Sequence, residues 1–307
     1  MSAGVQVDQT DLKTHPAVSP ASVPNTAAPD TAAPNTAAPQ ASIILNTQTP
    51  AAATVRYLLR IADACLIHAQ RLGEWTGHAP VLEEDIALTN MALDLVGQAR
   101  GVYTLAGQLG GQGFDEDQLA FLRDERDYLN PSLVELPNNG HGPGRPGCFA
   151  LTSLRNLMVS SWLLGLWQGL RTSSDPELAG IAGKAFKEAR YHQTHAADWV
   201  VRLGDGTADS HQRSQAALDL LWPHCSELFE DDATDAAAVA SGLGPAVSSL
   251  QADWRATMTA VLADATLSQP KDRAFRATGR RGVHSEHMGL LLAEMQYLQR
   301  AYPGGKW

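Results

Sequence analysis

The chain has 307 residues, of which 44% are hydrophobic, and a formal net charge of -10. This acidic balance argues against a nucleic-acid-binding protein, because nucleic-acid phosphates are recognised by a basic surface. The three cysteines are widely spaced and form no Cys-x-x-Cys pair, which argues against a zinc site and fits a reducing cytoplasm: Cys65, Cys148 and Cys225.

Residues 1–50 are rich in Ala, Pro and Thr and contain a repeated Asn/Asp-Thr-Ala-Ala-Pro unit that starts at Asn25. Because such a segment has few large apolar side chains to bury, the entropy cost of ordering it goes uncompensated. We therefore predict a disordered tail over 1–50 and one domain over 51–307. The tail lacks the apolar core of a signal peptide, and Ile43–Leu45 is too short to span a membrane.

Apolar residues at helical spacing predict four long helices in the domain. They cover Ala51–Leu72, Glu83–Leu109, Phe149–Arg171 and Ser174–Leu203. The third of them is apolar almost all round, which is typical of a helix at the centre of a bundle.

Shorter helices are expected between and after these four, and no stretch shows the alternation of a β-strand. The expected ranges are Phe114–Tyr128, Ser210–Leu228, Gly244–Leu267 and His284–Ala301. A Gly- and Pro-rich loop over Asn138–Gly147 separates the second and third long helices. We predict an all-α fold, a ferritin-like four-helix bundle with additional packed helices, in which this long connection is the crossover.

Bundles of this kind hold two metal ions with a Glu from each of two helices and a Glu-x-x-His motif from each of the other two. Two helices come close to that motif. The second has Asp94 and Gln98, and the fourth has Glu188 and His192. In both, the acid stands four residues before its partner instead of three, so the motif is broken.

Helical geometry places these residues at different angles to the apolar stripes. We expect His192 inside its stripe, Glu188 and Gln98 at the margins, and Asp94 pointing further away. On the first helix, Asp63 lies at the edge of the apolar face.

We expect His68 to face the opposite side of the first helix. The third helix has no Asp, Glu, His or Cys over 149–174. A working di-metal centre is therefore not expected. At best, four remnant positions could hold a single metal ion loosely, with Gln98 beside them: Asp63, Asp94, Glu188 and His192.

A simpler interpretation of the same residues is also open. Glu188 with His192, and Asp94 with Gln98, could form ordinary i,i+4 polar pairs within one helix. A histidine on an apolar stripe can equally be a hydrogen-bonded core residue.

Two further clusters carry weaker signals. At His284-Ser-Glu-His287, N-capping of the last helix by Ser285 is favoured over metal binding. The basic run Lys271–Arg281 is either a solvated loop or a contact for a phosphate-bearing ligand or an acidic partner.

Several segments together resemble the C subunits of multicomponent phenylacetyl-CoA 1,2-epoxidases. The resemblance covers essentially Ala51–Trp307, and the segments that carry it include Tyr57–Asp63, Glu74–Pro80, Leu93–Arg100, Lys187–His192, Gly282–His287 and Tyr302–Trp307.

The resemblance implies a cytoplasmic, structural subunit with no cofactor of its own and no catalytic residue. Its partner would be a homologous catalytic A subunit, which holds a di-iron centre and inserts one oxygen atom of O₂ into the ring of phenylacetyl-CoA. A flavin and iron–sulfur reductase subunit would supply electrons from NADPH for this step in phenylacetate degradation. This chain could touch the acyl-CoA at the subunit interface.

Two alternatives remain. One is a free-standing metal-dependent ferritin-like oxidase that uses Asp63, Asp94, Glu188 and His192. The other is a metal-free helical binding module without an oxygenase partner.

Overall fold

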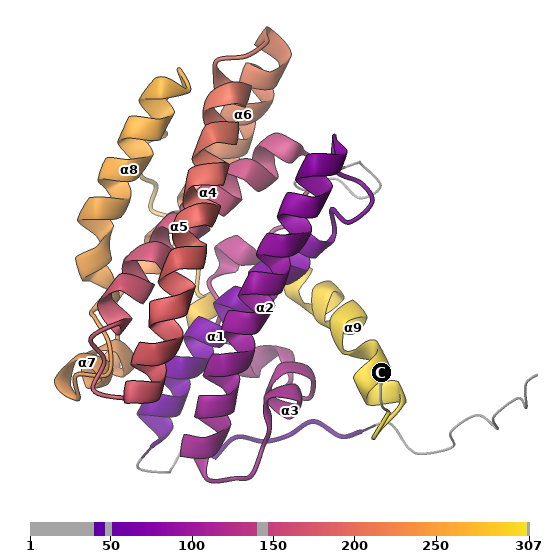
Figure 1. The fold of residues 1–307 in the computed structure, drawn as a ribbon, viewed down its shortest axis with the longest axis vertical. Coiled ribbons are helices and arrows are strands. Elements are labelled where there is room, and N and C mark those ends of the chain that lie inside the picture. Colours follow the sequence, from indigo (N-terminus) through magenta and orange to yellow (C-terminus); the bar gives the residue numbers. More distant parts are fainter. Residues whose placement is uncertain (1–39, 47–50, 140–146, 306–307) are drawn as a thin grey trace, which may run out of the picture. The chain divides into compact units, whose positions relative to one another are not determined.

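The computed structural model describes residues 40–46, 51–139 and 147–305 (Figure 1). Over these ranges the regular structure is helical, and the one β-type pairing is an isolated bridge between Thr278 and Val283. The all-α prediction is therefore confirmed.

Four long helices form the core of the domain: α1 (Ala52–Gly73), α2 (Leu82–Gly110), α4 (Phe149–Leu170) and α5 (Pro176–Gly204). α1 packs along α2, α4 packs along α5, and α2 faces α5. The predicted four-helix bundle is present, with each long helix within a few residues of its expected bounds.

The sequence signal for the start of α5 is realised as a side-chain cap. Asp175 accepts hydrogen bonds from the backbone N–H groups of Glu177 and Leu178, each at 2.9 Å, and Pro176 occupies the first helical position. Proline suits this position because its missing N–H would have no partner inside the helix. The cap thus satisfies two backbone N–H groups at the start of the helix that carries Glu188 and His192.

The remaining helices are shorter and pack around the bundle: α3 (Glu116–Phe121), α6 (Ala208–Leu221), α7 (Ala233–Ala240), α8 (Gln251–Asp264) and α9 (Glu286–Ala301). Short 3-10 helices join them: η1 (Glu125–Asp127), η2 (Ser132–Val134), η3 (Trp222–Phe229), η4 (Val247–Leu250) and η5 (Gly279–Arg281). Ser285 caps α9, as predicted, by accepting a hydrogen bond from the His287 N–H.

Three of the predicted shorter helices are wrong in extent. The helix expected over 114–128 ends at Phe121, and η1 follows after a break. The helix expected over 210–228 changes to the 3-10 form at Trp222, because Pro223 has no N–H for an α-helical bond. The helix expected over 244–267 begins as η4 and is α-helical only from Gln251 to Asp264.

Residues 40–46 are the described part of the predicted tail, and they lie against the domain. The Ile43 N–H donates to the carbonyl of Leu122 at 2.9 Å, and the Gln40 N–H donates to the carbonyl of Arg300 at 3.0 Å. Ile43 and Leu45 pack against the hydrophobic core. This short segment of the predicted disordered tail is therefore held by backbone bonds and apolar contact. The rest of the predicted tail, and residues 140–146 of the predicted loop, lie outside the described residues.

None of the helices found in the described ranges is both long enough and apolar enough to cross a lipid bilayer.

Candidate site between the four long helices

The residues that the sequence singled out on α2 and α5 pair with each other across the two helices. The Gln98 Nε2 donates to Oε2 of Glu188 at 3.0 Å. The His192 Nε2 lies 3.1 Å from Oδ2 of Asp94. The simpler interpretation, i,i+4 pairs within each helix, is therefore wrong, since Gln98 and His192 each contact an acid on the facing helix. His192 is buried, as predicted, and Asp94 lies nearer the surface.

Gln98 links all four long helices through its side-chain amide. Its Oε1 accepts from the Trp167 Nε1 of α4 at 3.2 Å and lies 3.6 Å from the Cys65 Sγ of α1. Its Nε2 holds Glu188 of α5. A neutral amide of this kind can both donate and accept, whereas a carboxylate could only accept. Gln98 thus occupies a ligand-like position as a hydrogen-bond hub.

A second polar contact joins α1 to α4 inside the bundle. The His68 Nε2 lies 3.1 Å from Oδ1 of Asn156, whose Nδ2 lies 3.5 Å from the sulfur of Met91. Burial, followed by the positive charge of Arg155, lowers the pKa of His68 to about 3. His68 is therefore neutral at ordinary pH and donates from Nε2 to Asn156.

The expected outward direction of His68 is wrong, because only 1% of the residue is exposed. The expectation treated α1 as a helix with one apolar face. In the structure α1 is enclosed on every side from Tyr57 to Ala69.

Asp63 is bound by an arginine that is distant from it in the sequence. Arg123, which follows α3, forms an ion pair with the Asp63 carboxylate, and both side chains are fully buried. The same carboxylate accepts from the Tyr103 hydroxyl and from the Leu129 N–H. Its oxygens are therefore already occupied by donors from three other segments of the chain.

These residues do not fit a di-iron centre. Within the described ranges, no three or more His, Cys, Asp and Glu side chains gather closely enough to hold a metal ion. Asp63 is paired with Arg123, and α4 contributes the side chains of Trp167 and Asn156 to these contacts, neither of which is a carboxylate. Burial also lowers the pKa of His192, although Asp94 partly opposes that shift, so His192 can act as a neutral donor.

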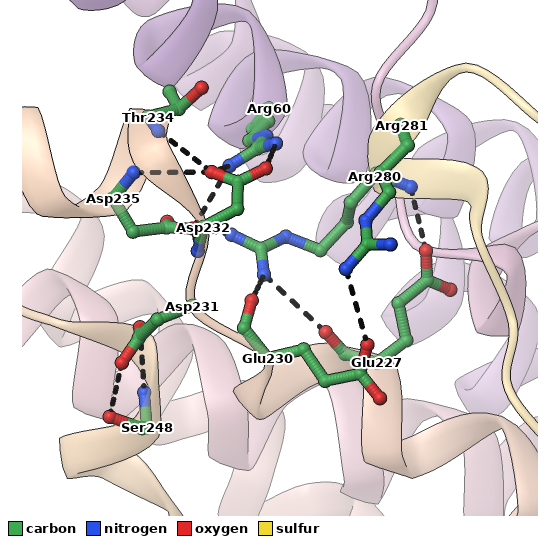
Figure 2. A network of polar contacts seen from close by, with 10 residues as sticks. All are labelled: Arg60, Glu227, Glu230, Asp231, Asp232, Thr234, Asp235, Ser248, Arg280 and Arg281. Atoms are coloured by element: carbon green, nitrogen blue, oxygen red, sulfur yellow. Dashed lines mark hydrogen bonds and ion pairs between the residues drawn. The ribbon is translucent and has the colours of Figure 1, made fainter.

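The basic run contributes to an internal ion network that local sequence does not reveal (Figure 2). Arg280 is buried and pairs with Asp235 at 2.8 Å, while Arg60 of α1 pairs with the same Asp235 at 3.0 Å and with Asp232. The prediction of a solvated loop is thus wrong for Arg280. The exposed Arg281 lies within 3.7 Å of the Glu230 carboxylate. The network holds η5 and α7 against α1.

His284 has a comparable structural role. Its Nδ1 lies 2.6 Å from Oε1 of Glu135 and its Nε2 lies 2.9 Å from the Tyr128 carbonyl. Both ring nitrogens therefore face acceptors, a geometry that the imidazolium form satisfies with two donated bonds. Burial lowers the pKa of His284, but the hydrogen bond and charge of Glu135 outweigh burial, so the net shift is upward.

The fold and this site define a ferritin-like helical protein whose ligand-like positions are engaged with other protein groups. A family model described as phenylacetic acid catabolic protein matches residues 42–307, and the chain belongs to this family. Among curated proteins, the chain is similar to the C subunit of 1,2-phenylacetyl-CoA epoxidase from Escherichia coli (strain K12). The two are 47% identical over 251 residues, which cover 82% of this chain and 98% of the relative. The resemblance noted in the sequence is therefore confirmed.

Proposed function

We propose that this chain is the C subunit of a phenylacetyl-CoA 1,2-epoxidase and supports a homologous catalytic A subunit. The similarity to the bacterial C subunit over most of both chains carries the proposal. The internal bonds of Asp63, Gln98 and Glu188 support a structural role, because the side chains that could bind iron are engaged with protein partners. In this proposal the di-iron centre and the oxygen chemistry belong to the A subunit.

The partners follow from the same proposal. The A subunit would receive electrons from a reductase subunit, and the phenylacetyl-CoA substrate would lie in or near the interface between the A and C subunits. The contribution of this chain would be to hold the A subunit in its active arrangement, with no electron or oxygen transfer of its own.

An apolar stripe on the outer face of α2 supports a docking role for this helix. The stripe consists of Leu82, Ile86, Leu93 and Val96, whose spacings of four, seven and three residues place them on one side of the helix. Leu82 is 73% exposed and Leu93 is 63% exposed. Exposed apolar stripes of this kind mark protein interfaces, because leaving them in water is unfavourable. We assign the catalytic A subunit as its occupant, since the proposed complex requires a large contact with that chain.

The test is reconstitution of the A subunit with wild-type chain and with Leu93→Glu. We expect the substitution to weaken association by about 10-fold or more, because it buries a charge at an apolar interface. Val239→Glu is the matched control, since Val239 is 47% exposed on α7 and lies outside the stripe. The proposal fails if the A subunit turns over phenylacetyl-CoA equally well without this chain. If Leu93→Glu and Val239→Glu change association equally, the stripe on α2 is not the docking surface for the A subunit.

The free-standing oxidase is less well supported. It needs Asp63 as a ligand, and that carboxylate would first have to leave Arg123, Tyr103 and the Leu129 N–H. An unpaired Arg123 would then be left buried in the core, at a cost of several kcal/mol by the usual penalty for a buried charge.

A further inference from the structure

A cavity of about 340 Å³ opens where α1 begins and α2 ends. Its walls come from α1, α2, α3, η1, α7 and the segment 40–46, and most of the large side chains that line it are apolar: Leu45, Val55, Leu59, Phe114, Leu119 and Leu129. This volume lies at the lower end of the range of small-molecule sites, roughly 300–1,000 Å³.

The cavity is kept open by small residues. Gly110, the last residue of α2, lines it, and a Cβ added there would meet only the Val55 Cγ2 at 3.8 Å. Ala52 of α1 and Ala106 of α2 line the same space. A larger side chain at Gly110 would therefore extend into the cavity without a clash at its Cβ.

One wall is fixed by a reciprocal pair of hydrogen bonds. The Asn46 N–H donates to Oε1 of Gln112 at 2.7 Å, and the Gln112 Nε2 donates to the Ile44 carbonyl at 3.1 Å. These bonds hold Leu45 in the lining. The cavity is thus bounded by an anchored segment as well as by helices.

Arg56 stands in the lining as a half-buried cation. Among the residues that the structure describes, no hydrogen bond or ion pair engages its guanidinium. The acidic residues Asp232 and Asp235 form ion pairs with a different arginine. This is Arg60, one turn further along α1 (Figure 2). Burial and the charge of Arg60 lower the pKa of Arg56, and the attraction of Asp232 opposes them.

A second cation, Arg126 of η1, lines the cavity and is exposed. Asp127 beside it is the one carboxylate in the described lining. The lining thus carries two guanidinium groups and one carboxylate, a net positive charge that favours an anionic occupant. A half-buried guanidinium without a counterion is costly, and an anion placed against it would form charge-assisted hydrogen bonds.

We propose that this cavity binds an amphipathic anion, with its apolar body against the leucine- and phenylalanine-lined wall and its head group on Arg56. The head group is a carboxylate or a phosphate monoester, since both match the planar donor fork of arginine. The volume suits a medium-chain or single-ring body. This binding site is separate from the polar contacts inside the bundle and does not depend on the proposed subunit role.

The proposal is tested by calorimetric titration of the full chain with decanoate, decyl phosphate and decanol. We expect at least one of the two anions to bind, and decanol to bind at least about 10-fold more weakly. A preference between decanoate and decyl phosphate identifies the head group.

Two variants locate the binding. Arg56→Gln should weaken anion binding by about 10-fold and leave decanol unchanged, whereas Gly110→Leu should weaken all three ligands by filling the cavity. Gly183→Leu is the control for the second change, because a Cβ at Gly183 meets no atom within 4 Å and Gly183 lies on α5, away from the lining.

The proposal is overturned if neither anion binds, if decanol binds as tightly as the anions, or if Arg56→Gln leaves anion binding unchanged. Arg56 has no partner to lose among the described residues, so this variant is expected to fold. It decides the question even if Gly110→Leu does not fold.

Discussion

The Nη1 of Arg123 donates to Oδ2 of Asp63 at 3.2 Å, and neither side chain is exposed to solvent. Arg123 also lies over the ring of Tyr128, with its guanidinium carbon 4.3 Å from the ring centroid. A metal site on α1 would need the Asp63 carboxylate as a free ligand. In this structure the carboxylate is paired with the positive charge of Arg123. The pair is therefore both a support of the fold and an obstacle to metal binding.

Removing the arginine should strongly destabilise the protein. In Arg123→Met the Asp63 carboxylate stays buried without its counterion, which typically costs about 3–5 kcal/mol. Urea denaturation monitored by circular dichroism measures the change in the free energy of unfolding. Arg213→Met is the control, because Arg213 pairs with Asp209 at the surface and should change stability by less than about 1 kcal/mol. A loss below that value in Arg123→Met would contradict the account of this pair.

The His284–Glu135 pair predicts a pH dependence of stability. The folded-state pKa of His284 is raised above its unfolded value of about 6.5. The stabilisation from the pair is therefore fully present below about pH 6.5 and is lost as the pH rises through the folded-state pKa. We expect the difference in unfolding free energy between wild type and His284→Gln to shrink with rising pH over that window. Two curves that stay parallel from about pH 6 to about pH 9 would be inconsistent with this pairing.

The hydrogen-bond hub at Gln98 predicts that an acid is not tolerated there. In Gln98→Glu the new carboxylate faces Glu188, whose oxygen now lies 3.0 Å from the Gln98 amide nitrogen. Repulsion between two partly buried carboxylates should lower the free energy of unfolding by about 3 kcal/mol near pH 8, and by less near pH 5, where the introduced carboxyl group can take up a proton.

Gln168→Glu on the exposed side of α4 is the control. Arg171 donates a hydrogen bond to Oε1 of Gln168, and it could equally donate to a carboxylate at this position. Denaturation of both variants at the two pH values gives the comparison. A Gln98→Glu protein as stable as the control at the higher pH would rule out this hub.

His68 should remain neutral well below the usual range for histidine. Its pKa is lowered to about 3, first by burial and then by the charge of Arg155. Nitrogen-15 NMR of the ring should show the proton on Nε2, which faces Asn156, and no titration between about pH 5 and about pH 8. A midpoint at the ordinary histidine value would mean that His68 is not enclosed as described.

The helices and the burial of His192 could be predicted from the sequence, because apolar spacing fixes which side of an amphipathic helix faces inward. The partners of Asp94 and Glu188 could not, since they depend on how α2 and α5 face each other. The prediction for His68 was wrong because α1 is surrounded, so its apolar stripe does not separate buried positions from exposed ones. The ion pair of Asp63 with Arg123 could not be predicted either. The two residues are sixty positions apart, and local sequence does not show how the intervening chain brings them together.

The extents of the short elements depend on side-chain bonds and on tertiary partners. α7 begins at a capping box in which the Asp232 side chain accepts from the Asp235 N–H and the Asp235 side chain accepts from the Asp232 N–H. The three-residue spacing of these two acids is visible in the sequence and is typical of a helix start. Arg280, in contrast, belongs to a basic run with the pattern of a solvated loop, and only the folded chain brings it to Asp235.

In the proposed function, Asp63, Gln98, Glu188 and His192 are engaged with protein partners, and iron binding belongs to the partner subunit. The most direct measurement is the iron content of the purified chain after anaerobic incubation with Fe(II) and removal of unbound metal. We predict far less than one iron per chain, both for the wild type and for a His192→Ala variant. Close to two irons per chain in the wild type, lost in His192→Ala, would contradict this account and show that the bundle holds a metal centre of its own.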